Sequence, residues 1–216
     1  MKSRAREPEV HAWWERLPGE RYWLDVTDRD GRDELLAAPR GDGGAAASWT
    51  HRLITHVRGG DVVFHYDASQ QAIVAVSLPH GRVEKRALWW PQPAEIPDEP
   101  ATRRQLPSWG IALRQSTELG TAVPLHEIAG AQWSLFPALR ALEDEVGDPL
   151  YYPFEMGSQT ATRPLTGYIF KLPALIVSGI PELARAASRV ERQVAAHAEA
   201  PSPRPVPAAR PYAESR

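Results

Sequence analysis

The chain has 216 residues, 43% of them hydrophobic, which is enough for one sizeable domain with a buried core. It has no cysteine, which excludes disulfides and thiolate metal sites and fits a reducing compartment such as the cytoplasm. The formal net charge of −2 does not single out a polyanionic partner. No stretch reaches the ~20 apolar residues that a membrane-spanning helix needs, so we expect no membrane partner.

The first part of the chain predicts a strand followed by a loop. Residues 1–20 are a polar lead-in that holds Trp13 and Trp14. Residues 21–26 alternate in polarity and are rich in aromatic side chains, which is typical of a strand. Residues 28–47 are rich in Asp, Gly, Arg and Ala, and they predict a loop with one helical turn at 34–38.

Residues 48–79 are the most informative stretch of the sequence. A Trp beside hydroxyl residues opens it, and Gly59-Gly60-Asp61 has the composition of a tight turn. The predicted order is a helix-like segment at 52–57, this turn, a strand at 62–66, a polar turn at 67–71 and a second strand at 72–78. The stretch therefore predicts a β-hairpin preceded by a short helix.

The middle of the chain predicts further strands beyond a Pro-rich connection at 91–100. Residues 108–114 are apolar and β-like, residues 115–120 predict a loop or hairpin, and residues 122–128 predict another strand or strand end. Several short strands with flanking helices indicate an α+β fold whose sheet is curved or barrel-like, because closure removes exposed edges.

The last third predicts two helices around one strand. Apolar residues at helical spacing predict a helix over 135–146, and Gly147 is a plausible C-cap. Residues 167–172 predict a strand, and residues 180–196 a helix with Pro181 in its first turn. We divide the chain into a lead-in (1–20), a base-binding domain with a C-terminal extension (21–185), and a helix end with a Pro-rich disordered tail or linker (186–216).

Residues 48–79 resemble the centre of the EVE domain and of the related YTH domain, both members of the PUA-like group. The shared order is a Trp, a short helix, a Gly-Asp turn, a strand, a turn and a second strand. The resemblance covers residues 22–128 as a pattern of motifs. It implies an α+β PUA-like, EVE-type curved β-barrel with flanking helices. It also implies a binding module that holds one modified base, methylated or hydroxymethylated, in an aromatic pocket.

The resemblance implies that Trp49 and Trp109 are the two walls of this pocket. Trp49 follows a small-residue loop, and Trp109 lies at the head of a predicted strand. Stacking on such rings is worth ~1–3 kcal/mol per base. The alternative for both residues is a structural role, because buried Trp is common in cores.

Four polar residues are further candidates for base contact. Asp25 and Thr27 end the first strand, at a place where EVE chains commonly carry Lys-Ser, so the bound base need not be the same. A carboxylate accepts hydrogen bonds from exocyclic amino groups such as cytosine N4 or adenine N6. Ser48 and Thr50 flank Trp49 and could donate to ring nitrogens. The alternative for all four is capping of turns and helix ends.

Three arginines are candidate phosphate contacts. Arg103 and Arg104 precede Trp109, and Arg163 lies in a loop rich in Ser and Thr. Arginine binds phosphate oxygens in a bidentate manner, and hydroxyl groups complete such sites. Solvated surface charge is the alternative for each.

Catalytic signatures are missing from the sequence. It has no asparagine, which an HNH nuclease motif requires, and no Walker loop, GxSxG or HExxH motif. The seven histidines lack the spacing of zinc ligands, so we expect no metal and no cofactor. We predict a DNA-binding reader, not an enzyme, that recognises modified bases for a partner nuclease or a fused effector domain in modification-dependent restriction. The alternatives are an RNA modified-base reader, a small hydrolase or nuclease with an unrecognised site, and a protein-interaction module.

Overall fold

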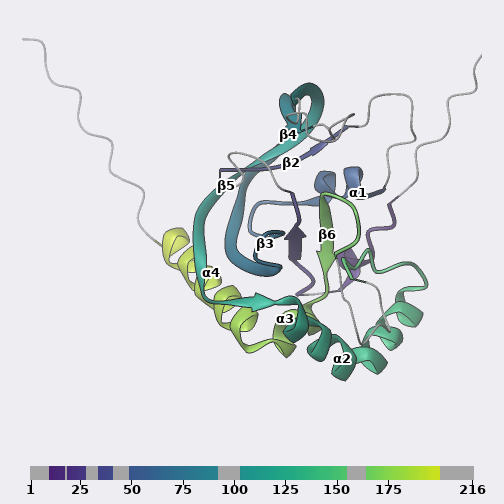
Figure 1. The fold of residues 1–216 in the computed structure, drawn as a ribbon. Helices are drawn as coiled ribbons and strands as arrows, with labels where there is room; N and C mark the ends of the chain where they lie inside the picture. The colour runs from purple at the N-terminus through teal and green to yellow at the C-terminus, as the bar shows by residue number, and fades with distance from the viewer. Residues whose placement is uncertain are drawn as a thin grey trace, which may run out of the picture.

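The computed structural model describes residues 10–17, 19–27, 34–40, 49–91, 103–154 and 164–199. These residues form an α+β fold in which a curled six-stranded mixed sheet is flanked by helices (Figure 1). Its elements are η1 (Trp13–Arg16), β1 (Tyr22–Asp25), β2 (Leu35–Pro39), α1 (Trp49–Arg52), η2 (Leu53–His56), β3 (Val62–Asp67), β4 (Ala72–Pro91), β5 (Arg103–Pro124), α2 (Leu125–Val146), β6 (Ile169–Leu172), α3 (Ala174–Gly179) and α4 (Pro181–Glu199).

The strands lie in the order β2-β5-β4-β3-β1-β6. The first strand, β1, runs parallel to β3, whereas the other neighbouring pairs are antiparallel. The parallel pair sets Asp25 beside His65 and Trp23 beside Val63. This pairing of two short strands far apart in sequence places the end of β1 in the middle of the fold.

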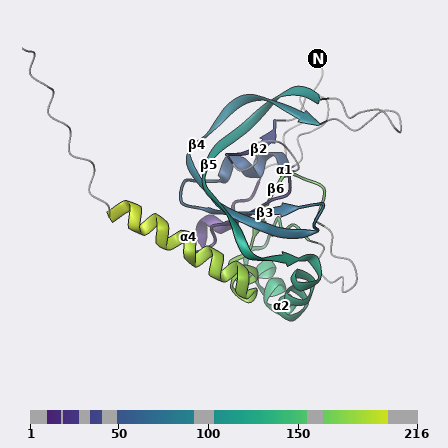
Figure 2. The same ribbon diagram turned by 60° about the vertical axis from the view of Figure 1, so that its left-hand side comes forward.

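The curl of the sheet comes from its two longest strands. Between β4 and β5 the register shifts at Ile73/Ala75, at Val76/Leu78 and at His80/Glu84. Each β-bulge bends the strand and increases its twist, so the pair wraps around β3 and β1 (Figures 1 and 2). Gly81, in the last of these shifts, has a φ of 82°, a conformation that glycine adopts without steric cost.

Helix α4 covers part of β4 and β5 with an apolar stripe. The buried side chains of Leu183, Ala186, Ala187 and Val190 recur at helical spacing, so one face of the helix meets the sheet. These residues belong to the same hydrophobic core as Trp13 and Trp14. The core therefore includes residues on both sides of the predicted domain bounds 21–185.

Several predicted elements are confirmed. The strand predicted at 62–66, the turn after it and the terminal helix predicted at 180–196 appear as β3, the β3–β4 turn and α4. Gly147 ends α2 in a left-handed conformation, with φ 70°, and its N–H donates to the carbonyl of Glu143. The tail from residue 200 onward lies outside the described residues.

Other predicted elements are wrong. The helical turn predicted at 34–38 is the strand β2, because residues 35–39 pair with β5. The loop predicted at 115–120 is part of one continuous strand, β5, although Gln115 has a positive φ of 57°. The helix predicted at 135–146 is present and ends at Val146 as predicted, but it begins ten residues earlier, at Leu125, and contains Pro137. The strand end predicted at 122–128 therefore stops at Pro124.

Candidate functional site

Four elements meet at the end of β1. The backbone N–H of Val26, just after β1, donates to the carbonyl of Tyr168 at 3.0 Å. The ring of Tyr168 lies 4.7 Å from that of His51 in α1 and 5.2 Å from that of Trp90 in β4, measured between centroids. Tyr168 immediately precedes β6, so β1, α1, β4 and β6 each bring a group to one place.

We call Trp49, Thr50, His51, Trp90 and Tyr168 the β1-end cluster. Trp49 is half-buried, and its ring contacts those of Tyr151 and Phe170 at 5.1 and 5.7 Å. Thr50 and Trp90 are buried, and the indole N–H of Trp90 donates to the hydroxyl of Ser108 at 2.9 Å. The cluster thus combines aromatic faces with hydroxyl and imidazole groups.

Gly167 makes the close packing of this cluster possible. A Cβ atom added there would lie 2.6 Å from the ring of Phe170 and 2.9 Å from the Cγ2 atom of Thr50. Such distances are shorter than a methyl group allows, so only glycine lets the chain before Tyr168 pass over α1.

A buried polar network lies beneath the end of β1. Oδ1 of Asp25 accepts hydrogen bonds from the backbone N–H and the hydroxyl of Thr27, at 3.0 and 2.5 Å. Oδ2 of Asp25 lies 3.2 Å from Nδ1 of His65, and Nε2 of His65 lies 2.7 Å from the hydroxyl oxygen of Ser77. All four side chains are buried. Their mutual bonds satisfy polar groups that burial would otherwise leave without water.

The order Ser77, His65, Asp25 is that of a hydrolase triad, in which a carboxylate orients an imidazole that activates a hydroxyl. A nucleophile must reach its substrate, yet Ser77 has no exposed surface. None of the three residues lines the two pockets described below. The arrangement therefore favours a positioning network over a hydrolytic site.

Trp109 lies in different surroundings from the β1-end cluster. It neighbours Ser108 on β5, and consecutive side chains of a strand point to opposite faces. Ser108 bonds Trp90 of the cluster, so Trp109 faces the other way. The guanidinium of Arg40 and the ammonium of Lys85 lie 4.7 and 5.7 Å from its ring centroid. The structure brings Thr50, Asp25 and Thr27 toward one end of β1, whereas Trp49 packs on Tyr151 and Phe170, and Trp109 lies elsewhere on the sheet.

The predicted phosphate contacts are described in part. Arg103 and Arg104 are exposed at the start of β5, opposite Pro91 and Trp90 of β4. Arg163 and the predicted base contact Ser48 lie outside the described residues.

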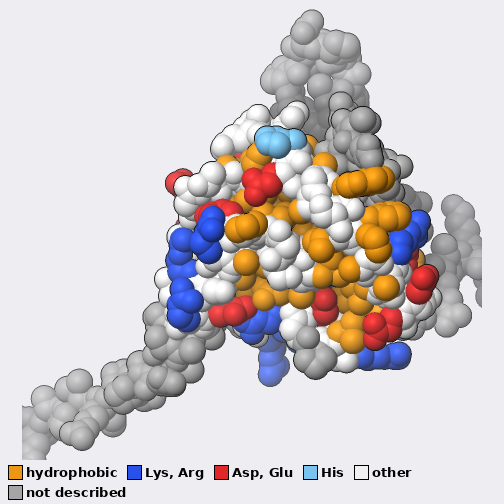
Figure 3. Space-filling view, turned by 90° about the horizontal axis from the view of Figure 1, so that it is seen from below, with side chains coloured by type: hydrophobic (Ala, Val, Ile, Leu, Met, Phe, Trp, Pro, Cys, Tyr) orange, Lys and Arg blue, Asp and Glu red, His pale blue; other side chains and the backbone are white. Residues whose placement is uncertain are grey.

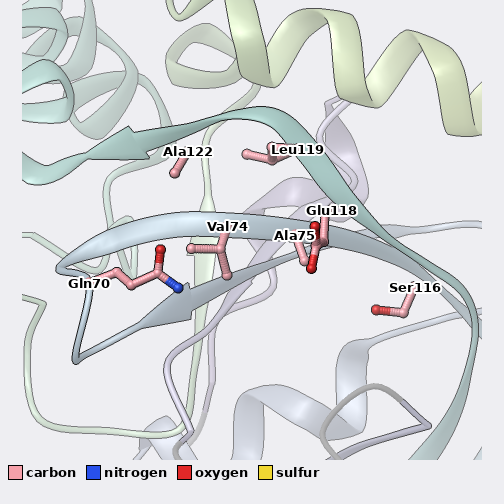
Figure 4. A pocket seen from close by; sticks show the side chains of 7 residues that line it. All are labelled: Gln70, Val74, Ala75, Ser116, Glu118, Leu119 and Ala122. Atoms are coloured by element: carbon pink, nitrogen blue, oxygen red, sulfur yellow. The ribbon is translucent and has the colours of Figure 1, made fainter.

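One pocket, of about 510 Å³, lies where the ladder between β4 and β5 opens. Residues 119–122 of β5 lie opposite the single residue Val74 of β4, and the lining side chains come from both strands and from Gln70 in the turn before β4 (Figure 4). Glu182 of α4 accepts a hydrogen bond from the freed backbone N–H of Thr121 at 3.3 Å. A second pocket, of about 330 Å³, adjoins Gly59, His80 and Arg114. Neither contains a predicted site residue.

Lys171 is an unexpected charge in the core. This β6 residue is fully buried, and its ammonium donates to the carbonyl of Tyr22 at 2.8 Å. Its Nζ lies 4.8 and 5.8 Å from the ring centroids of Trp23 and Trp14. Burial lowers the pKa of Lys171 to about 7, because desolvation penalises the charged form.

Two carboxylates raise the pKa of this lysine and so oppose the lowering of that pKa by burial. Glu20 and Asp61 attract the Lys171 charge, and burial raises the pKa of both carboxyl groups. Asp61 accepts hydrogen bonds from the indole N–H of Trp23 at 2.8 Å and from the backbone N–H of Arg58 at 2.9 Å. Asp61 thereby joins the Gly-Gly-Asp turn to β1.

Among the described residues, no group of three or more His, Cys, Asp and Glu side chains could hold a metal ion. Within the same residues, no helix is long and apolar enough to cross a membrane.

Sequence reasoning missed His65, Ser77, Trp90 and Tyr168. His65 and Ser77 lie within predicted strands, although the second strand runs to Pro91 instead of ending at 78. The partner of His65 is set by the parallel β1–β3 pair. Trp90 and Tyr168 are adjacent in the fold yet 78 positions apart in the sequence. The aromatic character of Trp89-Trp90 and of Tyr168 was the only available signal.

No family model matches the chain. No curated protein matches it. Three solved structures resemble it weakly, all of them structural-genomics targets with no stated function. Rpa0253 from Rhodopseudomonas palustris is 14% identical, with a TM-score of 0.39 over 75% of this chain and 91% of that one. Atu2648 from Agrobacterium tumefaciens is 12% identical, with a TM-score of 0.34 over 73% of this chain and 92% of that one. A protein from Pseudomonas putida is 16% identical, with a TM-score of 0.33 over 79% of this chain and 99% of that one. Likeness of this degree carries no functional argument.

Proposed function

We propose that the chain is a nucleic-acid-binding module with a PUA-like barrel of the EVE type that holds one modified base at the β1-end cluster. The observation that carries the proposal is the contact of Tyr168 with both His51 and Trp90, next to the backbone of Val26. Aromatic faces beside hydrogen-bonding groups are what a flat heterocycle with polar edges requires.

Each residue of the site has a separate task. We assign Trp49, half-buried beside Tyr151, as the ring on which the base stacks. We assign Tyr168, which contacts Trp90, as a second wall of the site. Asp25 is 1% exposed and already holds Thr27 and His65, so we assign it to positioning the end of β1. The backbone groups after β1 then contact the edge of the base, and Thr50, which is buried next to Gly167, supports the chain before Tyr168.

A binding titration tests the proposal. Wild-type protein and the Tyr168→Ala variant are titrated into labelled 12-mers of DNA and of RNA. Each 12-mer carries one cytosine, 5-methylcytosine, 5-hydroxymethylcytosine, adenine or N6-methyladenine. We expect one modified base to bind at least tenfold more tightly than its parent, and Tyr168→Ala to abolish that preference. Trp133→Ala is the matched control, because Trp133 is exposed on α2, outside the cluster.

Equal affinity of the wild-type protein for every modified and unmodified oligonucleotide would overturn the proposal. A preference confined to the RNA series would identify an RNA reader instead of a DNA reader. We further propose that cleavage comes from a partner nuclease or a fused effector domain, as in modification-dependent restriction.

The hydrolase alternative has one observation in its favour, the Ser77–His65–Asp25 arrangement. Its test is Ser77→Ala: a hydrolase would lose all turnover of ester substrates, whereas the base reader would keep its binding preference. The complete burial of Ser77 favours the second result.

A further inference from the structure

The upper part of the β4–β5 hairpin forms an arm made of residues 80–91 and 103–112. The two strands pair across it, with Lys85 opposite Trp109 and Trp89 opposite Gln105. Both views of the fold show these ends of β4 and β5 rising beyond β1, β3 and β6 (Figures 1 and 2). Most side chains of residues 80–89 and 103–107 are exposed, so this part of the arm can meet a partner.

The arm is strongly basic. It has five basic side chains and one acidic side chain, Glu84, which pairs with Arg86 at 2.8 Å. The basic residues, all exposed, are Arg82, Lys85, Arg86, Arg103 and Arg104. The chain as a whole has a net charge of −2, so the excess of basic side chains on the arm differs from the balance of the whole sequence. By contrast, the face seen from below shows acidic and basic side chains interspersed around hydrophobic ones (Figure 3).

One face of the arm joins these charges to indole rings. Residues directly opposite each other in an antiparallel pair share a face, so Lys85, Trp89, Arg103 and Trp109 lie on the same side. The cation–π contact of Lys85 with Trp109 agrees with this register. Trp89 is 60% exposed, the highest value among the large hydrophobic side chains that the structure describes.

We propose that this face of the arm binds a single-stranded nucleic-acid segment, with Trp89 stacking on an unpaired base and Lys85 and Arg103 contacting phosphates. Exposed aromatic rings beside a row of cations are the chemistry that holds single strands without reading their sequence. An acidic peptide would use the cations but has no flat ring to place on Trp89. The inference rests on the proposed function, because the bound segment would be the one that flanks the base in the β1-end cluster.

The test uses the full chain and a labelled, unmodified 12-mer of DNA, followed by fluorescence anisotropy at two salt concentrations. We expect single-stranded DNA to bind more tightly than its duplex, and Trp89→Ala to weaken single-strand binding about 5- to 150-fold, the loss of one stacked base. Lys85→Glu with Arg103→Glu should lower the salt dependence by the equivalent of at least two phosphate contacts. Trp133→Ala and Arg140→Glu on α2 are the matched controls and should bind as the wild type does.

Unchanged affinity of Trp89→Ala for single-stranded DNA would overturn the inference. So would a poly-glutamate peptide of equal length that binds as tightly as the DNA, since the arm would then recognise negative charge alone. Circular dichroism melting checks the fold of each variant, and Trp89→Phe, which keeps a ring, should retain most of the affinity.

The two proposals fail separately. If the base pocket is absent but the arm binds single-stranded DNA, Trp89→Ala weakens the binding of modified and unmodified DNA equally. The wild-type protein then prefers no modified base. If the pocket is present but the arm is not used, Tyr168→Ala abolishes the preference while Trp89→Ala changes nothing.

Discussion

Nδ1 of His65 lies 3.2 Å from Oδ2 of Asp25, with both side chains buried, on two parallel strands 40 positions apart in the sequence. The hydroxyl of Ser77 at the other imidazole nitrogen and the two donors of Thr27 complete the network. These bonds fix the direction in which the chain leaves β1, and the proposed base site begins there.

The first prediction concerns this network. Asp25→Ala should lower the free energy of unfolding by about 2–4 kcal/mol, because it leaves His65 and Thr27 buried without their acceptor. Ser77→Ala should cost less, about 1–2 kcal/mol, because it leaves only Nε2 of His65 buried without a partner. Urea denaturation measures both values, and a cost for Ser77→Ala equal to that for Asp25→Ala would contradict this order.

The second prediction concerns Trp49. Trp49→Ala should leave the protein folded and weaken binding of the preferred modified oligonucleotide by about 1–3 kcal/mol, the stacking contribution. It should also reduce stability modestly, because the ring packs on Tyr151 and Phe170. Trp133→Ala serves as the control. If Trp49→Ala abolishes cooperative melting, the residue belongs to the core and is not a wall of the pocket.

The third prediction concerns Gly167. Gly167→Ala should destabilise the protein by about 1–3 kcal/mol, since the new methyl group would overlap Phe170 and Thr50. It should weaken base binding as well, because Tyr168 follows directly. The matched control is Gly130→Ala: nothing lies within 4 Å of its added Cβ, and the substitution should stabilise α2 by about 0.5–1 kcal/mol. Equal melting temperatures of the two variants would refute the steric argument.

The fourth prediction concerns Lys171. Its pKa is about 7 in the folded protein, against an ordinary value of 10.5, so between these values the unfolded chain binds a proton that the folded chain does not. Stability contributed by this group should therefore rise as the pH is raised from about 7 toward 10.5. Lys171→Met removes the titrating group and should flatten this rise.

The measurement is the urea midpoint of the wild type and of Lys171→Met at several pH values between 7 and 9.5. Glu20 and Asp61, whose pKa values burial raises, act in the opposite direction and at lower pH, where stability should fall as they lose their protons. Parallel curves for the two proteins above pH 7 would show that Lys171 does not titrate in this range.

Local patterns in the sequence determined much of the secondary structure. The Gly59-Gly60-Asp61 turn, the hairpin strand β3 and the C-cap at Gly147 are predicted, and α4 begins one residue after the predicted start at 180. Each depends on the backbone preferences of a few neighbouring residues, or on an apolar period within one element. An α+β fold with a curled sheet follows from the number of short strands and is what the structure has.

The tertiary structure decided the pairings. Residues 35–39 form a strand only because β5 supplies their hydrogen-bond partners. Strand β5 continues past Gln115 because β4 pairs with the residues before Gln115 and with those after it. Asp25 meets His65 only through the parallel β1–β3 pair. The register between β4 and β5 turns Trp90 toward Tyr168 and Trp109 toward Arg40. Such contacts join residues far apart in the chain, and no local preference encodes which strand becomes the neighbour of another.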